Sequence, residues 1–376
     1  MINLDPILKV IHEAVGVVAP AIQVEVRHHG TTLLTEQAGW LDPDHRCFPV
    51  TPNSRFDLAS VTKLFTTAAF MRLVEMGKIR LDQPVKTILP AFSGIRPIAA
   101  YEDPLHAGIM IPPASGEGQT VNTDRITFRN LLVHNSGLPA WRPLKDQADR
   151  ESALNMAMST SFFYPPGSKI VYSDIGLILT GLAIETITGL RLDRAIQQMV
   201  LSPLHLSHTE FLPIGEEIDD LSIYVPTEWC QWRQRRVIAE VHDENAARLG
   251  GIAGHAGLFS NAHDLAAFGE MFLKGGEGFL HPDTIKEMTR EQTEYEKTRR
   301  GIGFVLWHPD PDASSNPLSQ KAYGHTGFTG TSLWMDPERQ LVIAAMTNRV
   351  YYGRDADAIL TFRVALHKSI VEVVDK

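Results

Sequence analysis

The sequence predicts an α+β fold in which one antiparallel sheet is built from both ends of the chain. Residues 21–40 alternate apolar and polar side chains as strands do, and strand-forming runs return over 301–347. The segments between these regions carry mainly helical periodicity. We therefore expect a single domain over 1–376, with an α/β lobe from 1–80 plus 280–376 and an inserted, mostly helical lobe over 81–279.

The first elements follow from local patterns. Residues 1–16 place Ile7, Ile11 and Val15 at helical spacing, which predicts an amphipathic helix. Residues 21–40 predict a hairpin with its turn at His29-Gly30. A proline-containing loop over 41–57 leads to a helix that begins near Ser60 and ends near Gly77.

The central and last elements are less uniform. Residues 93–121 are rich in Pro and Gly and lack clear periodicity, so we expect a long loop. A short helix closes at Gly137, a longer one covers 174–199 with a break at Gly189, and a third starts after an Asn261 cap. Strands separated by turns then lead to a closing helix over 354–373.

Composition narrows the class of protein. The 376 residues are 44% hydrophobic and 21% charged, as in ordinary globular proteins, and a net charge of −9 gives no reason to expect nucleic acid or membrane partners. Two cysteines, Cys47 and Cys230, are too few for a disulfide framework or a four-thiolate metal site, so reduced thiols are expected. The N-terminal residues lack the basic start of a secretory signal, and we expect a cytoplasmic location.

The segment Ser60-Val61-Thr62-Lys63 carries the strongest chemical signal. Residues three apart on a helix share one face, so Ser60 and Lys63 are expected to lie together. A hydroxyl at the start of a helix also lies beside free backbone N–H groups and the positive end of the helix dipole. One helical turn thus combines a nucleophile, an amine and part of an oxyanion site.

Two further motifs follow in the chain. Tyr172-Ser173-Asp174 stands where an extended run meets a helix, a position from which a tyrosine can point into a cleft. His325-Thr326-Gly327 lies on an expected strand, where the glycines permit close approach of backbone and ligand. Taken alone, each has a plain alternative: a packed aromatic residue before a helix, and a bulge or turn.

Together, Ser60/Lys63, Tyr172-Ser173-Asp174 and His325-Thr326-Gly327 resemble the three ordered motifs of the serine β-lactamase and penicillin-binding protein superfamily. The likeness is to its class C-like branch, which includes esterases and D-aminopeptidases. "LLVHNSGL", "GGIAGHAGLFSNAHDLAAF" and "GHTGFTGTSLWMDPE" extend it from about residue 20 to 350. The resemblance implies a β-lactamase/transpeptidase-like fold with the active site between the two lobes.

The resemblance also implies roles for the site residues. Ser60 is the acylated nucleophile, and Lys63 and Tyr172 pass its proton to the leaving group. The backbone N–H groups of Ser60 and Phe328 form the oxyanion hole, and Asp174 and the segment 325–327 contact the substrate. No cofactor is required by this chemistry.

Two departures from the family pattern bear on chemistry. His325 replaces the lysine that many β-lactamases carry. A histidine is mostly neutral at pH 7, so we do not expect it to hold a substrate carboxylate as strongly as lysine does. Asp174 replaces the usual asparagine, and a carboxylate near Lys63 favours the charged ammonium. We therefore hypothesise that Tyr172 carries more of the proton transfer than Lys63.

The remaining histidines do not form a recognised metal-ligand spacing. His242, His255 and His263, and the pair His205/His208, are expected to be surface or capping residues rather than ligands. No metal site is predicted.

These observations predict a serine hydrolase that works through an acyl-enzyme on a small-molecule ester, amide or D-peptide. An esterase ranks first, a D-stereospecific peptidase or DD-carboxypeptidase second, and a weak β-lactamase third. A non-catalytic binding protein on the same fold is the alternative of another class. The loop over 93–121 and the region of Trp229 and Trp232 are candidates to shape the pocket, and the sequence leaves the oligomeric state open.

Overall fold

A six-stranded antiparallel sheet forms the centre of one half of the protein, in the strand order β12-β13-β14-β15-β1-β2. The computed structural model describes residues 2–104, 106, 108–293 and 299–376. The strands of this sheet are β1 (Ala21–His28), β2 (Thr31–Gly39), β12 (Val305–Leu306), β13 (Tyr323–Thr326), β14 (Ser332–Asp336) and β15 (Leu341–Thr347).

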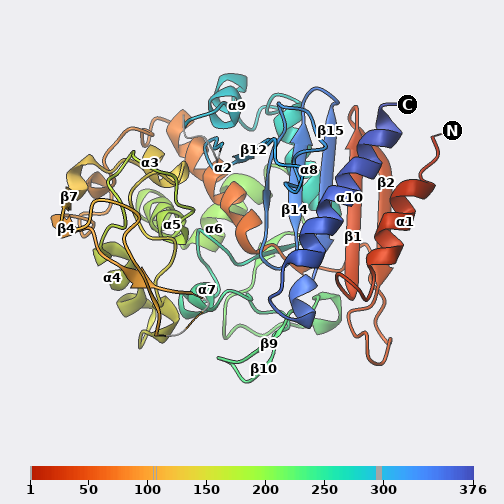
Figure 1. The fold of residues 1–376 in the computed structure, drawn as a ribbon, viewed down its shortest axis with the longest axis horizontal. Helices are drawn as coiled ribbons and strands as arrows, with labels where there is room; N and C mark the ends of the chain where they lie inside the picture. The colour runs from red at the N-terminus through yellow and green to blue at the C-terminus, as the bar shows by residue number, and fades with distance from the viewer. Residues whose placement is uncertain (1, 105, 107, 294–298) are drawn as a thin grey trace.

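Both ends of the chain build this sheet, as the sequence predicts. Strand β1 pairs with β2 on one side and with β15 on the other, where Ile22 lies opposite Thr347. Helices α1 (Asp5–Ala14) and α10 (Asp357–Val374) pack on each other and cover one face, and α8 (Ala262–Leu273) covers the other. In Figure 1 the two termini lie close together beside this sheet.

The other half is mainly helical, and α5 (Asp174–Thr188) runs through it (Figure 1). Helix α2 (Thr62–Glu75) packs against α5 and connects this half to the sheet region. The remaining helices are α3 (Phe128–Leu132), α4 (Arg150–Ser159), α6 (Leu192–Ile196), α7 (Glu244–Arg248) and α9 (Pro282–Thr289). One continuous apolar core joins the two halves, since it contains side chains from α2, α5, α8 and β14.

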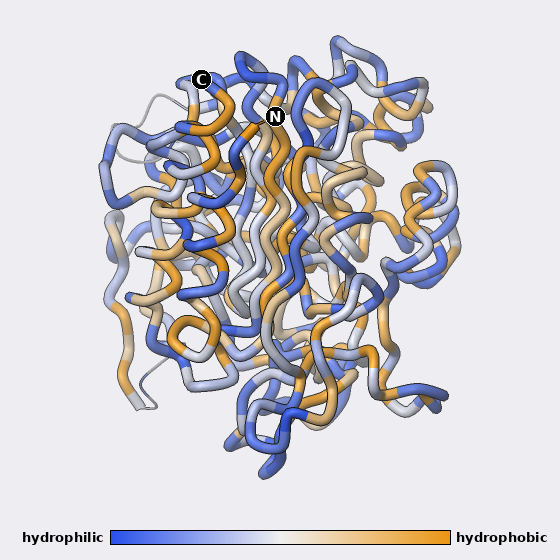
Figure 2. Tube along the Cα trace, turned by 90° about the vertical axis from the view of Figure 1, so that its right-hand side faces the viewer, coloured by the Kyte–Doolittle hydropathy of each residue, from blue (hydrophilic) through white to orange (hydrophobic). Residues whose placement is uncertain are grey.

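Smaller strands complete the structure. They are β3 (Phe56–Asp57), β4 (Ile95–Pro97), β5 (Tyr101–Glu102), β6 (Met110–Ile111), β7 (Thr120–Asn122), β8 (Glu210–Phe211), β9 (Trp229–Cys230), β10 (Arg235–Arg236) and β11 (Leu258–Ser260). Figure 2 shows hydrophobic residues along the central strands and hydrophilic residues in many of the turns beyond their ends, as expected for strands buried under helices.

Three details differ from the sequence expectations. Helix α8 falls inside the range assigned to the helical lobe, yet it packs on β1, β14 and β15, so the boundary at 279 lies too late. The segment 93–121 is not wholly irregular, because β4 pairs with β7 and β5 with β6. The short helix α3 ends at Leu132 rather than Gly137, and His134 adopts the left-handed conformation that closes it (φ 61°).

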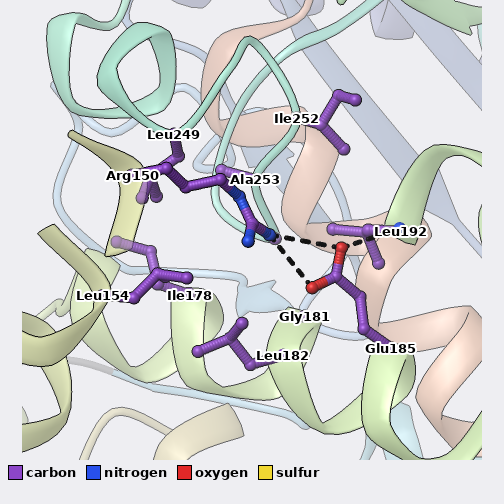
Figure 3. Close-up of a pocket in the computed structure, with 11 residues that line it drawn as sticks. Arg150, Leu154, Ile178, Gly181, Leu182, Glu185, Leu192, Leu249, Ile252 and Ala253 are labelled. Carbon is purple, nitrogen blue, oxygen red and sulfur yellow. Dashed lines mark hydrogen bonds and ion pairs between the residues drawn. The ribbon is translucent and has the colours of Figure 1, made fainter. Parts of the chain in front are cut away.

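One small cavity lies among the helices away from the three motifs (Figure 3). The ion pair between Arg150 and Glu185 lies beside this cavity. The cavity volume of about 10 Å³ is at the lower limit for holding one water molecule. It therefore has no room for a substrate.

Within the described residues, membrane-span criteria are not met by any single helix. Two consecutive helical segments, Asp174–Thr188 and Leu192–Leu201, together have the length and composition of a membrane span, but the chain bends by 77° between them.

Candidate active site

Ser60 lies on a tight turn that other parts of the chain hold in place. It is part of a 3₁₀ helix, Ala59–Val61, and α2 begins two residues later. Ala59 has a left-handed backbone (φ 44°), which is a strained conformation for a residue with a side chain. The buried Asp57 carboxylate accepts hydrogen bonds from the backbone N–H groups of Ala59 (2.7 Å) and His242 (2.6 Å). The strain beside Ser60 is thus balanced by local hydrogen bonds.

The end of β13 approaches this turn closely. Thr331 Oγ1 donates to the Leu58 carbonyl (2.9 Å), and Thr329 Oγ1 donates to the Asp57 carbonyl (2.7 Å). A Cβ atom at Gly327 would lie 2.5 Å from the Leu58 oxygen, a distance that only glycine avoids. The glycine of the third motif is therefore required by the contact between two backbone segments.

Lys63 is buried and lies at the centre of the polar contacts. Its Nζ donates to Ser60 Oγ (2.8 Å) and to the His255 carbonyl (3.0 Å), and it lies 2.8 Å from Asp174 Oδ1. Burial lowers the pKa of Lys63, but the Asp174 carboxylate and Tyr172 outweigh it, so the net pKa lies above its ordinary value. Lys63 is therefore an ammonium at neutral pH.

Tyr172 stands just before α5, with its ring against several cationic or polar groups. Lys63 Nζ lies 4.8 Å and the Arg300 guanidinium 5.3 Å from the centre of the ring. The His134 ring packs at 4.7 Å, and its Nδ1 accepts a hydrogen bond from the Ser173 backbone N–H (3.0 Å). His134 thus fixes the segment that carries Tyr172.

The Tyr172 hydroxyl is buried and makes no hydrogen bond of normal geometry with a described residue. Burial raises its pKa, Lys63 lowers it and Asp174 raises it, and the net pKa lies above the ordinary value of a tyrosine. In the resting protein Tyr172 is therefore a neutral phenol beside an ammonium.

His325 is almost fully buried on β13, and its ring lies 5.8 Å from that of Tyr172. Burial, together with the charges of Arg300 and Lys63, holds the pKa of His325 well below its usual range. Nδ1 lies 2.8 Å from the Thr326 carbonyl and so carries the proton, which leaves Nε2 as a lone-pair acceptor. The side chain is neutral, as the sequence indicates for histidine at this position.

A cavity of about 350 Å³ opens beside Ser60. Tyr172, His325, Thr326, Gly327 and Phe328 line it, so all three motifs meet there. Lys63 and Asp174 lie behind Ser60 and Tyr172 through the contacts above. The predicted site residues are therefore neighbours in space, although they are spread over 269 positions from Ser60 to Phe328 inclusive.

The sequence reasoning missed three arginines that line this cavity: Arg300, Arg349 and Arg363. Arg300 is buried, and its Nε and Nη1 have no hydrogen-bond partner among the described residues. Burial lowers the pKa of Arg300, yet a guanidinium stays charged at neutral pH. No acidic residue is found among the described residues that line the cavity. An arginine directly before the apolar run 301–307 was the only sequence signal for this feature.

Two of the other histidines are not where the sequence analysis expected them. His242 and His255 are buried, not surface residues, because each is paired with a carboxylate. His255 Nε2 lies 3.0 Å from Asp243 Oδ1, and His242 Nε2 lies 3.1 Å from Glu228 Oε1. The pair with His255 lowers the pKa of Asp243 against the effect of burial.

Asp174, Asp243 and His255 bring their ligand-type atoms within 4.8 Å of one another. Lys63 already places a positive charge there, since its Nζ contacts Asp174 and the His255 carbonyl. A divalent cation bound to this group would be repelled by that ammonium. The arrangement is better suited to holding Lys63 than to holding a metal.

Comparisons with known proteins agree with the motifs. The family model Beta-lactamase matches residues 9–367. A Salmonella paratyphi B protein described as "Putative D-alanyl-D-alanine carboxypeptidase" is 32% identical over 329 residues, which cover 80% of this chain and 70% of that protein.

Two solved structures share the fold. EstCE1, a hydrolase with promiscuous acyltransferase activity, has a TM-score of 0.72 at 21% identity, and the match covers 96% of this chain and 98% of the EstCE1 chain. The octameric penicillin-binding protein homologue from Pyrococcus abyssi has a TM-score of 0.71 at 22% identity, and the match covers 96% of this chain and 76% of that protein's chain. The predicted β-lactamase/transpeptidase-like fold is therefore confirmed.

Proposed function

Because the chain belongs to the beta-lactamase family, we propose that it is a serine hydrolase that forms an acyl-enzyme on Ser60. The observation that carries the proposal is the contact of Ser60 Oγ with Lys63 Nζ at 2.8 Å, beside Tyr172 and at the wall of a cavity. A hydroxyl, an amine and a phenol in one buried group are the parts that acyl transfer requires.

In the proposed acylation, Tyr172 acts as the base in its phenolate form. Ser60 Oγ attacks the acyl carbon and its proton moves to the phenolate, while the negative charge on the substrate oxygen is stabilised by the backbone N–H groups of Ser60 and Phe328. The phenol then donates that proton to the leaving oxygen or nitrogen as its bond to carbon breaks. A water molecule repeats the sequence, which releases the acid and regenerates Ser60.

Lys63 has an electrostatic role in this scheme. Held as an ammonium by Asp174, it favours the phenolate of Tyr172 and so makes proton removal from Ser60 easier. Asp174 opposes this effect, since its charge raises the pKa of Tyr172.

The proposal is tested by trapping the intermediate. Incubation with a p-nitrophenyl ester, rapid acid quench and mass spectrometry are expected to show one acyl group on the peptide that contains Ser60. An acyl group on any other residue, with Ser60 unmodified, would contradict the proposed role.

Small esters remain the first proposed substrates. The arginines favour the second candidate, an amide or peptide hydrolase whose substrate carries a carboxylate. Arg300 offers two buried, unpartnered N–H positions in a cavity without acidic residues, and a carboxylate is the group that a guanidinium binds best. It supplies the carboxylate anchor that the neutral His325 lacks.

Arg300→Gln is expected to raise KM for a carboxylate-bearing substrate by about 10- to 100-fold, because a charge-assisted hydrogen bond is lost. The comparison is an N-acyl-D-alanyl-D-alanine against its C-terminal amide, or a succinyl against a butyryl ester. KM for the uncharged substrate is expected to change little and serves as the control. Equal changes for both substrates would show that Arg300 does not recognise the carboxylate.

Asp174→Asn is expected to increase kcat/KM at pH 7 by roughly three- to tenfold. The Asp174 charge raises the pKa of both Lys63 and Tyr172, so its removal lowers both. Activity needs the Tyr172 phenolate, and the rate therefore rises with pH; the variant should begin this rise at lower pH. A pH profile of kcat/KM tests the shift, and Asp174→Glu is the control that keeps the charge. A profile that moves to higher pH would contradict the assignment.

A further inference from the structure

A second cavity, of about 750 Å³, lies beside the catalytic cavity and has no part in the proposed chemistry. Three tryptophans from two segments line it: Trp141, and in the β9–β10 hairpin Trp229 on β9 and Trp232 in the turn. Residues 102–104 of the segment 93–121 form another wall. We call this space the tryptophan cavity.

Side chains in contact with one another connect the linings of the two cavities. Phe328 lines the catalytic cavity, and the His242 ring stacks on it with the ring centres 5.6 Å apart. His242 in turn contacts Glu228, which lines the tryptophan cavity (3.1 Å). Arg354 also lines the tryptophan cavity, and its guanidinium lies 6.0 Å from the Phe328 ring. A substrate bound at Ser60 and extending past Phe328 would therefore approach the tryptophan cavity.

The two cavities carry opposite charge. The described residues lining the tryptophan cavity include five carboxylates but only two cations, Lys145 and Arg354. The carboxylates are those of Glu102, Asp103, Asp146, Glu228 and Glu244. Four of these carboxylates have partners, since Glu102 pairs with Arg142, Asp103 with His106, and Glu228 and Glu244 share Arg354. Asp146 makes no ion pair with a described residue. The Asp146 carboxylate is therefore the charge in this cavity that is available to a cation.

The tryptophans suit the same kind of ligand. An indole face attracts cations, and Trp232 already has the guanidinium groups of Arg233 and Arg248 at 5.2 Å and 5.6 Å. The rings of Trp141 and Trp229 have no such cation among the described residues, and Trp229 is 53% exposed. Both rings are therefore open to a ligand.

We propose that the tryptophan cavity binds a cationic group of the substrate, an ammonium or alkylated ammonium, while the catalytic cavity receives the reacting carbonyl and an anionic group. The inference rests on the proposed function for its link to catalysis. It defines the substrate class as a molecule with a positive group on one side of the scissile bond and a negative group on the other. A peptide with a free amine and a free carboxylate meets this description.

Binding is tested first in the Ser60→Ala protein, where turnover cannot interfere. Titration with choline, followed by tryptophan fluorescence and calorimetry at low salt, is expected to give an affinity at least about tenfold tighter than that of its uncharged isostere, in which a tert-butyl group replaces the trimethylammonium. Adding Trp229→Ala should weaken choline binding about tenfold, and Asp146→Asn should weaken it severalfold. Phe48→Ala removes an exposed aromatic ring that lines neither cavity, and should leave it unchanged.

Equal affinity for choline and the isostere, or binding unaffected by Trp229→Ala, would overturn the inference. Because Trp229 and Asp146 lie at the surface, these variants are expected to fold, and a thermal melt checks that they do.

Catalysis provides the second test. The wild-type protein is compared on p-nitrophenyl esters whose acyl chain ends in trimethylammonium or in tert-butyl. The charged ester should have the higher kcat/KM, by about tenfold, and Trp229→Ala should bring the ratio of the two kcat/KM values close to one. Equal rates on both esters would overturn the subsite and leave the hydrolase proposal intact. Choline binding with no hydrolysis of either ester would overturn the hydrolase proposal and leave the cation site intact.

Discussion

Replacing Ser60 by alanine is expected to lower kcat/KM for p-nitrophenyl butyrate by about 10⁴-fold or more and to abolish covalent labelling by penicillin. Loss of the proposed nucleophile would remove the proposed acyl-enzyme pathway altogether, so only slow background hydrolysis would remain. Steady-state hydrolysis at matched protein concentration measures the first effect, and intact-protein mass spectrometry measures the second.

The fold should survive this change. Lys63 loses its contact with Ser60 Oγ but keeps Asp174 and the His255 carbonyl, so its charge stays compensated. Ser159→Ala is the matched control, because that exposed hydroxyl bonds only to the Asn155 carbonyl of its own helix. Turnover that persists in Ser60→Ala would show a different nucleophile. A folded wild-type protein that neither hydrolyses esters or D-peptides nor takes a label would support the non-catalytic alternative.

Tyr172→Phe is expected to slow acylation by about 10³-fold, at least as much as Lys63→Met. The phenol is the proposed carrier of the Ser60 proton, and a group in this role contributes roughly 10² to 10⁴ in rate. Lys63 acts through charge, since Asp174 holds it as an ammonium that cannot accept a proton. Rapid-mixing measurement of the first turnover separates acylation from later steps.

Stability must be followed in the same variants. Lys63→Met leaves the Asp174 carboxylate without its ion pair, so thermal melts are needed to separate lost rate from lost fold. Tyr323→Phe, a buried tyrosine on β13 that packs against Phe304, is the control and should keep the wild-type rate. A Tyr172→Phe protein with near wild-type acylation would refute the assignment of the base.

Much of the site could be predicted because its chemistry is local. Ser60 and Lys63 lie on one turn of chain, and the effect of a carboxylate at position 174 on the charge of Lys63 follows from the residue type; the structure places Asp174 2.8 Å from Lys63. The burial of His242 and His255 could not be predicted, because each depends on a carboxylate whose position is set by tertiary packing.

The other features that the sequence did not predict also depend on tertiary packing. In the sequence Arg300 is one of many charged residues, and only the folded chain places it against Tyr172. The helical pattern of α8 predicts a helix but not the surface it packs on. Gly269 was a usable signal: a Cβ atom there would lie 2.9 Å from Leu333 and Val342, which reflects close packing of this helix on the sheet.

The order of strands in the sheet has a consequence for biosynthesis. Strand β1 leaves the ribosome well before its neighbour β15, which lies more than 300 residues later, as the pairing of Ile22 with Thr347 shows. The β1–β2 hairpin must therefore wait, with one edge unpaired, until β15 has been translated. Such long-range closure is slow, and during that interval the open edge of β1 is exposed to pairing with other chains.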